Sequence, residues 1–380
     1  MKIGIITHYY QSQNYGGNLQ AYALCRFLNK RHSTEQICYV HRSLKRKMLK
    51  KCYKLPIKAM SLLKRKLTFL LTKRETKKIA FALEQRRERL LAFNCSIPHS
   101  LIIYNEETIC EAEKVYDLFI TGSDQVWHPA AVNDAYLLNF VKDKPKISYA
   151  ASLAVDSLTK EYSESLHTSL ENFRAISVRE RNAVELLCAL TSKSVEWVLD
   201  PVFFLAKEEW EEIIPVRQIK EKYLFCYFLG NNKKIRELAR LYAEKHVLKI
   251  VTLPHLNGNY NRADEGFGDV QLYDVAPADF LSLIKNAEYI FTDSFHAVAF
   301  SLIFKKQYFV FNRDASRKMN SRIYSLGELF GTENRFFKNK IEMNVQYLEC
   351  INEIDYDQEK KGFDELLERS IRFIERGLSN

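Results

Sequence analysis

Short apolar runs alternate with segments of helical periodicity along most of the chain. The apolar runs are rich in Val, Ile, Tyr and Phe, residue types that favour strands. The segments between them repeat apolar residues at helical spacing. Because strand–helix–strand units form parallel sheets, this alternation predicts an α/β fold. In the first half the predicted strands are 2–7, 36–41, 115–121, 146–150, 175–178 and 195–199, and the predicted helices are 19–28, a basic segment running on to 93, 158–173 and 182–190.

A second series of the same kind begins after a charged connector at 207–222. Its predicted strands are 223–229, 249–253, 289–292 and 308–311, and its predicted helices are 233–245, 278–285 and 297–304. We therefore expect two doubly wound Rossmann-like domains that face each other across a cleft. The expected boundaries are 1–206, with a basic helical insert at 42–93, then 207–335, and a C-terminal helical extension at 336–380 that contains an amphipathic helix.

Composition restricts the class of protein. Hydrophobic residues make up 47% and charged residues 27% of the 380 positions, which excludes disordered and collagen-like chains. The apolar run 297–304, which contains one serine, is far shorter than the roughly 20 residues of a membrane-spanning helix. The opening apolar run is too short for a secretory signal, so we expect a cytoplasmic protein. The eight cysteines form no Cys-x-x-Cys pair, so no metal site or disulfide scaffold is predicted.

The positive charge is concentrated in one segment. Positions 42–78 hold 15 basic residues and one acidic residue, Glu75, so this segment carries a net +14 and the remainder a net −4. Three interpretations are open: a solvated helical excursion, a docking segment for an anionic membrane surface, and a nucleic-acid-binding segment. No DNA- or RNA-binding motif accompanies the charge, so nucleic acid is not an expected partner.

Candidate site residues follow the predicted strands, because ligands of doubly wound sheets bind beyond the carboxyl ends of the strands. The loop after the first strand contains Gly16, Gly17 and Asn18 at the start of a helix. There, bare backbone amides can meet an anion, although a plain helix-entry turn is the alternative. Neither a Walker loop nor a dinucleotide fingerprint is present.

Three more strands are followed by polar residues. Asp124 and Trp127 follow the strand that ends at 121, where the carboxylate can hold a sugar hydroxyl or cap a helix and the indole can stack on a sugar. Arg179 and Arg181 follow the strand that ends at 178, and arginine pairs suit phosphate and carboxylate groups. A surface ion pair with Glu180 is the alternative for Arg181. The fourth motif, Asp200-Pro201-Val202-Phe203, also follows a predicted strand and can contribute to a site, although a stiff turn is the favoured interpretation.

The sharpest motif is Thr292-Asp293-Ser294-Phe295-His296, which joins an apolar strand to an apolar helix. The positive end of the helix dipole favours a neutral His296 imidazole, able to take or pass a proton. The alternative is a structural histidine bonded to Asp293. Further donors follow the next strand, namely Arg313, Arg317, Asn320, Ser321 and Arg322. Taken alone, these residues predict an enzyme or a binder for an anionic small molecule.

The five motifs, together with the later Ser321-Arg322-Ile323 and in this order, resemble the polysaccharide pyruvyl transferase family. The resemblance covers about 1–335, and it rests on the joint order of motifs that are individually weak. The motifs are Asn14-Tyr15-Gly16-Gly17-Asn18-Leu19-Gln20, Gly122-Ser123-Asp124-Gln125-Val126-Trp127, Ser177-Val178-Arg179-Glu180, Asp200-Pro201-Val202-Phe203, Thr292-Asp293-Ser294-Phe295-His296 and Ser321-Arg322-Ile323.

The resemblance implies a GT-B-like enzyme that moves the pyruvyl group of phosphoenolpyruvate onto a sugar as a ketal and releases phosphate. It implies no bound cofactor, and an acceptor that is a polysaccharide or lipid-linked glycan, in keeping with peripheral attachment at the inner membrane face. His296 would transfer a proton, and Arg179 would clamp the donor phosphate or carboxylate. Further donor contacts would come from Gly16, Gly17, Asn18, Ser294 and Arg322, and acceptor contacts from Asp124 and Trp127.

One departure from the family pattern concerns the donor site. Some members carry Arg-Leu-His where this chain has Ser294-Phe295-His296, so either another cation, such as Arg322 or Arg313, replaces the missing arginine or the donor differs. Two other functions remain open: a nucleotide-sugar glycosyltransferase on the same kind of fold, and a non-catalytic anion or glycan binder. The acceptor sugar and the oligomeric state are not predicted.

Overall fold

The first half of the chain folds into a parallel sheet. The computed structural model describes residues 1–41, 73–216, 219–254, 261–313, 321–337, 344–358 and 361–379. Within these, the first sheet has the strand order β3-β2-β1-β4-β5-β6-β7, and every adjacent pair is parallel. The chain reverses its direction of winding between β1 and β4, which is where doubly wound sheets bind ligands. The strands are β1 (Lys2–Ile6), β2 (Ser33–Tyr39), β3 (His99–Tyr104), β4 (Leu118–Thr121), β5 (Lys146–Ala151), β6 (Ala175–Val178) and β7 (Val195–Trp197).

The second sheet repeats this plan with six strands among the described residues, in the order β10-β9-β8-β11-β12-β13. All its pairs are parallel, and the winding reverses between β8 and β11. The strands are β8 (Tyr223–Tyr227), β9 (Lys249–Thr252), β10 (Val270–Gln271), β11 (Tyr289–Thr292), β12 (Gln307–Phe311) and β13 (Phe336–Phe337). Because β13 belongs to this sheet, the sheet extends past the boundary predicted at 335.

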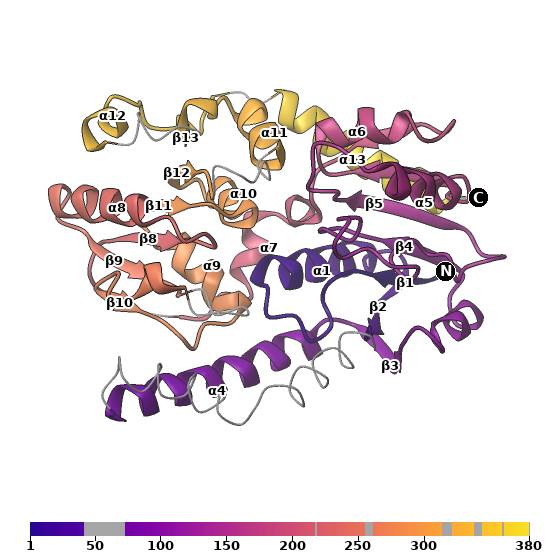
Figure 1. Cartoon of the computed structure of the whole chain (residues 1–380), viewed down its shortest axis with the longest axis horizontal. Coiled ribbons are helices and arrows are strands. Elements are labelled where there is room, and N and C mark those ends of the chain that lie inside the picture. Colours follow the sequence, from indigo (N-terminus) through magenta and orange to yellow (C-terminus); the bar gives the residue numbers. More distant parts are fainter. Residues whose placement is uncertain are drawn as a thin grey trace.

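Helices connect and cover both sheets (Figure 1). Those of the first half are α1 (Tyr15–Leu28), α4 (Lys73–Ser96), α5 (Lys160–Leu170), α6 (Arg181–Cys188) and α7 (Lys207–Glu211), with 3₁₀ turns η1 (Ile109–Lys114) and η2 (Pro201–Phe204). Those of the second half are α8 (Lys233–Lys245), α9 (Pro277–Lys285), α10 (Phe295–Ile303), α11 (Ser321–Phe330), α12 (Val345–Glu349) and α13 (Lys361–Leu378), with 3₁₀ turns η3 (Arg262–Asp264) and η4 (Glu333–Arg335).

An apolar core joins the two halves. The ring of Tyr15 at the start of α1 stacks on Phe280 of α9, with 5.1 Å between ring centroids. The Tyr15 hydroxyl donates a hydrogen bond to the backbone oxygen of Val275. Helix α10 is buried along nearly its whole length, which explains why its sequence is too apolar for a surface helix. The facing ends of the two sheets are thereby held close together.

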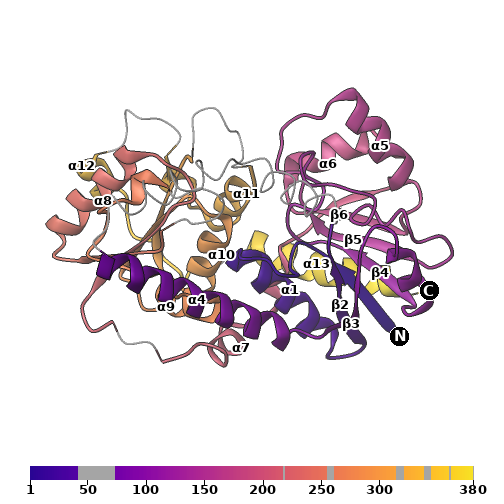
Figure 2. The ribbon, with the colours of Figure 1, turned by 60° about the horizontal axis from the view of Figure 1, so that its bottom comes forward.

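Helix α4 lies across both halves, as Figures 1 and 2 show from two sides. Its Leu90 is buried in the shared core, and its Arg89 forms a 2.6 Å ion pair with Asp279 of α9. The end of the predicted basic insert is therefore an integral brace between the halves. The rest of that insert, 42–72, lies outside the described residues.

The predicted C-terminal helix is α13, which returns to the first sheet. Its Phe373 and Ile374 are buried in the core beside β1 and β5, whereas Leu366 reaches the core shared by both halves. Ser370 accepts a hydrogen bond from the backbone amide of Leu199. Both chain ends consequently lie on the side of the first sheet (Figure 1).

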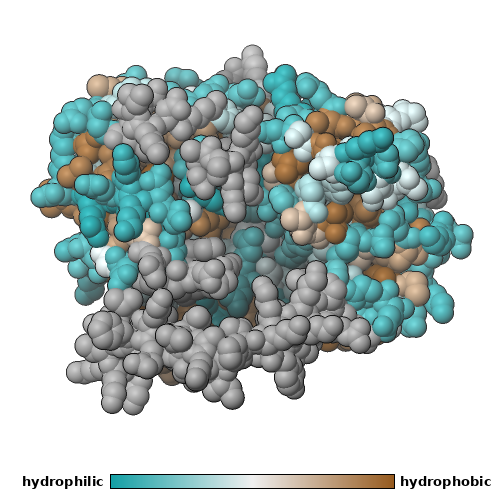
Figure 3. All heavy atoms as spheres, in the orientation of Figure 1, coloured by the Kyte–Doolittle hydropathy of each residue, from teal (hydrophilic) through white to brown (hydrophobic). Residues whose placement is uncertain are grey.

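The described surface is mainly polar on the face shown in Figure 3, where apolar side chains form scattered patches among hydrophilic ones. Among the helices within the described ranges, none combines the length and apolar character needed to cross a membrane.

Candidate active site between the two sheets

The site forms where the carboxyl ends of the strands in the two sheets face each other. Its residues follow five strands, and they come from sequence positions nearly 300 residues apart. They are His8 after β1, Asp124 after β4, Arg179 after β6, Asp200 after β7 and His296 after β11, and Arg322 of α11 lies beside them.

Arg179 is the centre of a buried ion-pair network. One terminal nitrogen, Nη1, donates to Asp200 Oδ2 at 2.6 Å, and the other, Nη2, lies 3.4 Å from Asp124 Oδ1. The guanidinium carbon lies 4.5 Å from the centroid of the Phe295 ring. Arg179 thus faces the predicted site; the two carboxylates contact its terminal nitrogens, whereas its Nε has no hydrogen-bond partner among the described residues. Its role as a donor clamp stays a prediction.

Asp200 is the residue that the sequence interpretation undervalued. Its Oδ1 accepts from the amide of Val202, as expected for a turn, but its Oδ2 also accepts from Arg179 and from the Ser123 hydroxyl. Burial by itself would raise the pKa of Asp200, but the nearby imidazole of His296 and the charge of Arg179 hold it well below its usual range. Asp200 is therefore an ionised, buried counter-charge. The sequence feature that could have pointed to this role is the position of Asp200 directly after the predicted strand 195–199.

Asp124 is placed by a backbone turn of unusual geometry. Its φ is +69° and that of Gly122 is +109°, so the chain turns sharply as it leaves β4. Burial would raise the pKa of the Asp124 carboxyl, but the charges of Arg179, His296, His8 and Arg322 hold it below its usual value. A second buried anion consequently faces the space between the sheets.

His296 begins α10 and touches the first half of the chain. Its side chain is 9% exposed, and its Nε2 lies 3.7 Å from Asp200 Oδ2. Within the described part of the chain, Nε2 has no hydrogen-bonding partner at normal distance. The alternative in which His296 bonds to Asp293 is wrong, because Asp293 accepts from the amides of Leu229 and Gly230 instead. The imidazole is buried yet still available to a ligand.

Gly16 is required because the imidazole of His296 packs directly on it. A Cβ atom at Gly16 would lie 2.0 Å from His296 Nδ1, a distance that no side chain tolerates. Gly16→Ala should displace the imidazole and lower enzymatic activity by about 100-fold, the scale of effect that a 1 Å misplacement produces. Activity and thermal melting of both variants are the measurements. The matched control is Gly327→Ala, where the added Cβ meets its nearest neighbour at 3.6 Å, and equal activity of the two variants would contradict this packing argument.

Arg322 is a buried cation that forms no ion pair with the residues that the structure describes. It is 8% exposed, its guanidinium carbon lies 5.7 Å from the Phe295 centroid, and it makes no hydrogen bond or ion pair with any described residue. Burial and the nearby charge of Arg179 lower its pKa to about 10. Because a buried unpaired charge is costly, an anion bound here would be strongly favoured.

The loop at the start of α1 holds three residues predicted to contact the donor, Gly16, Gly17 and Asn18. Asn14 caps α1 by accepting from the amide of Gly16, and the helix itself offers no partner to the amides of its first turn. Asn18, predicted to bind the donor, is fully buried, donates to the backbone of Ser12 and accepts from Asn94. The Asn18 prediction is therefore corrected: its side chain holds the loop and α4 together.

The acceptor prediction for Trp127 is also corrected. This side chain is 0% exposed, donates through Nε1 to the backbone of Tyr136, and packs edge-on against Phe173. Its indole forms part of the core of the first half and offers no face to a sugar. The pattern of an aromatic residue after a strand could not show that the chain near 136 folds back over it.

The remaining predicted residues lie at the margin. Ser294 is the buried N-cap position of α10, and its amide donates to Thr292. Arg313 contacts Asp293, and Arg181 lies at the surface 3.6 Å from Glu328. Positions 317 and 320 lie outside the described residues.

His8 is a site residue that the sequence analysis missed, although it comes soon after β1. Burial lowers the pKa of its imidazole, and the ring packs edge-on against Tyr136. In the described ranges, no cluster of three or more His, Cys, Asp or Glu residues could hold a metal ion.

These features define a class: a two-sheet α/β protein of GT-B-like fold with a buried, charged site between facing sheet edges. Residues 14–315 match the family described as polysaccharide pyruvyl transferase. The chain belongs to the polysaccharide pyruvyl transferase family. Comparison with curated protein sequences gave no match.

Solved structures confirm the fold. UDP-GlcNAc 2-epimerase from Methanocaldococcus jannaschii is similar with a TM-score of 0.56 and 15% identity, over 99% of this chain and 100% of that chain. UDP-N-acetylglucosamine 2-epimerase from Rickettsia bellii has a TM-score of 0.51 and 11% identity, over 99% and 96%. At such identities the likeness concerns the fold alone, and it confirms the predicted α/β, GT-B-like architecture.

Proposed function

We propose that this chain transfers the pyruvyl group of phosphoenolpyruvate to two hydroxyls of a sugar in a polysaccharide or lipid-linked glycan. C3 of the donor gains a proton and becomes a methyl group, and C2 forms bonds to two sugar oxygens as its bond to the phosphate oxygen breaks. One hydroxyl proton balances the proton added at C3, and the other leaves with phosphate. The products are a pyruvate ketal and inorganic phosphate.

The single observation that carries the proposal is the buried guanidinium of Arg322, which has no ion-pair or hydrogen-bond partner in the described part of the chain and lies beside His296 and the Arg179 network. Phosphoenolpyruvate carries a carboxylate and a phosphate, and either can neutralise that charge. The serine at 294, where an arginine is expected by resemblance, is consistent with this assignment because Arg322 supplies a cation from another element. The amides at the start of α1 are further candidate donors to the same anion.

We assign proton transfer to His296, because its Nε2 is buried, lacks a hydrogen-bonding partner within the described residues and lies close to ionised Asp200. Asp200 acts as a positioning residue for both His296 and Arg179. Asp124, held by the other nitrogen of Arg179, is the candidate group for an acceptor hydroxyl. The anionic-membrane role of 42–78 and a cytoplasmic location remain predictions.

Titration of the purified chain with phosphoenolpyruvate, UDP and GDP tests the donor. Phosphoenolpyruvate should raise the melting temperature, and Arg322→Ala should weaken its binding by at least about tenfold, since a charged hydrogen bond contributes about 1.5–3 kcal/mol. Removal of an unpaired buried charge should leave the ligand-free protein at least as stable as before. Calorimetry and thermal shift measure both effects.

The matched control is Arg372→Ala, an exposed arginine of α13 that pairs with Glu368 and lies outside the site. It should bind phosphoenolpyruvate like the wild type. Stabilisation by UDP or GDP, with no response to phosphoenolpyruvate, would overturn the proposal in favour of a nucleotide-sugar glycosyltransferase. Absence of any response would favour a protein without this chemistry.

A further inference from the structure

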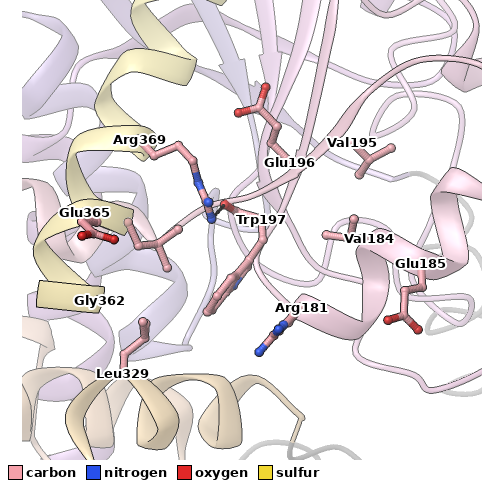
Figure 4. Close-up of a pocket in the computed structure, with 11 residues that line it drawn as sticks. Arg181, Val184, Glu185, Val195, Glu196, Trp197, Leu329, Gly362, Glu365 and Arg369 are labelled. Atoms are coloured by element: carbon pink, nitrogen blue, oxygen red, sulfur yellow. Dashed lines mark hydrogen bonds between the residues drawn. The ribbon is translucent and has the colours of Figure 1, made fainter.

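A groove separate from the candidate active site lies where α6, β7, α11 and α13 meet (Figure 4). Its volume is about 590 Å³, and its lining comes from both halves of the chain and from the C-terminal helix. The residues that matter for its chemistry are Arg181, Val184, Trp197, Leu329, Glu365 and Arg369.

Trp197 provides the groove with an aromatic surface. Figure 4 shows its indole ring extending between Arg181 and Leu329. The guanidinium carbon of Arg181 lies 5.9 Å from the ring centroid, and Arg369 donates to the backbone oxygen of Trp197 at 3.2 Å. The other two tryptophans of the chain, Trp127 and Trp210, are 0% exposed, whereas Trp197 is partly exposed.

The rim of the groove carries both signs of charge. Arg181 and Arg369 contribute guanidinium groups, and Glu185, Glu365 and Glu196 contribute carboxylates, of which Glu196 pairs with Arg376. Such a rim offers donors and acceptors together and has no strong preference for an anion or a cation. An aromatic face surrounded by groups of this kind fits a ligand that has both C–H faces and many hydroxyls.

We propose that this groove binds a neutral oligosaccharide. The inference rests on the proposed function, because the natural occupant would be the part of the acceptor glycan beyond the sugar that is modified. The groove would thus select acceptors by length, a property that a site for one sugar ring alone cannot provide.

Two direct links connect the groove to the candidate active site. The Trp197 Nε1 donates to the backbone oxygen of Arg179 at 3.2 Å. Helix α11 carries Arg322 in its first turn and Leu329 near its end, and seven residues of helix rise by roughly 10 Å. An oligosaccharide can span this separation. Its binding in the groove would contact the elements that hold Arg179 and Arg322.

Tryptophan fluorescence tests the proposal directly, because Trp197 is the partly exposed member of the three. A glycan array of neutral oligosaccharides identifies ligands, and each hit is then titrated against the intrinsic fluorescence. We expect bound trisaccharides or longer chains to shift the emission and to protect Trp197 from acrylamide quenching. Trp197→Phe should retain binding on the array but lose the fluorescence response, and Trp197→Ala should bind about tenfold more weakly.

Two further variants separate the groove from general effects on folding. Arg369→Ala should weaken oligosaccharide binding about fivefold, and Arg372→Ala on the same helix should not. Val184→Phe fills the groove without removing a polar group, and it should abolish binding. Unaltered binding in Val184→Phe and Trp197→Ala, or no neutral oligosaccharide bound by the wild type, would overturn the proposal.

Titration with phosphoenolpyruvate keeps the two proposals apart. Arg369→Ala should keep its affinity for phosphoenolpyruvate, because Arg369 lies on α13 in the groove lining and its hydrogen bond goes to the backbone of Trp197. If the chain binds oligosaccharide at Trp197 but does not bind phosphoenolpyruvate, the groove proposal is supported and the proposed pyruvyl transfer is rejected. A response to phosphoenolpyruvate without oligosaccharide binding would do the reverse.

Discussion

Replacement of His296 by alanine is expected to lower the rate of pyruvyl transfer by about 10²- to 10⁴-fold, the usual contribution of a positioned acid or base. The expectation follows from the isolated position of its Nε2, which faces ionised Asp200 at 3.7 Å and has no other partner among the described residues. The affinity for phosphoenolpyruvate should change little, because the arginines would hold the anion. Phosphate release at saturating donor and acceptor is the measurement.

The control for His296→Ala is His32→Ala, which changes a histidine in the turn between α1 and β2. It should retain full activity. Since the imidazole of His296 fills space against Gly16, the melting temperature of His296→Ala must be compared as well. A folded His296→Ala protein with undiminished phosphate release would show that another group moves the proton.

Asp200→Asn should produce the largest loss of stability of any conservative substitution in the site. Asparagine keeps the shape and the acceptor for the Val202 amide, but it removes a charge that Arg179 and Ser123 contact. Loss of one partner from a buried ion pair costs about 3–5 kcal/mol in the free energy of unfolding. Urea unfolding followed by circular dichroism measures the difference.

The appropriate comparison is Glu368→Gln, which breaks an exposed pair with Arg372 on α13. It should change the free energy of unfolding by less than about 1 kcal/mol. Equal losses for Asp200→Asn and Glu368→Gln would refute a buried, charged Asp200.

The depressed pKa of Asp200 also predicts how acid acts on the fold. A carboxyl whose pKa is lower in the folded than in the unfolded chain stabilises the fold above the unfolded pKa, near 4, and that contribution disappears as the pH falls further. The unfolding free energy of the wild type should therefore decrease below about pH 4. That of Asp200→Asn should decrease less steeply over the same interval.

Much of the architecture follows from local sequence patterns. The strand ending at Thr292 and the apolar helix after it were predicted because their residues are apolar on all sides, as parallel strands and buried helices require. Strand β3 was not predicted, since Leu101, Ile102 and Ile103 are exposed at the sheet edge and its register with β2 is irregular. Short β10 and β13 have two residues each, too few for periodicity.

The candidate site was predictable in its positions but not in its pairings. Strand ends indicated Asp124, Arg179 and His296, because polar residues there can meet at one edge of a sheet. Which acid neutralises which arginine depends on packing between distant segments, so Asp200 was interpreted as a turn residue. For the same reason, sequence patterns could not predict that Arg322 would be buried without an ion-pair partner among the described residues.

The return of α13 to the first sheet has a consequence for biosynthesis. Phe373 and Ile374 complete a core that also contains Ile3 and Ile5, so the first sheet remains unfinished while most of the polypeptide emerges from the ribosome. Part of the apolar surface of the nascent N-terminal half stays uncovered until the last two turns of α13 have been synthesised. The N-terminal half therefore completes its core late, after the second half of the chain has been made, and does not fold as an independent unit.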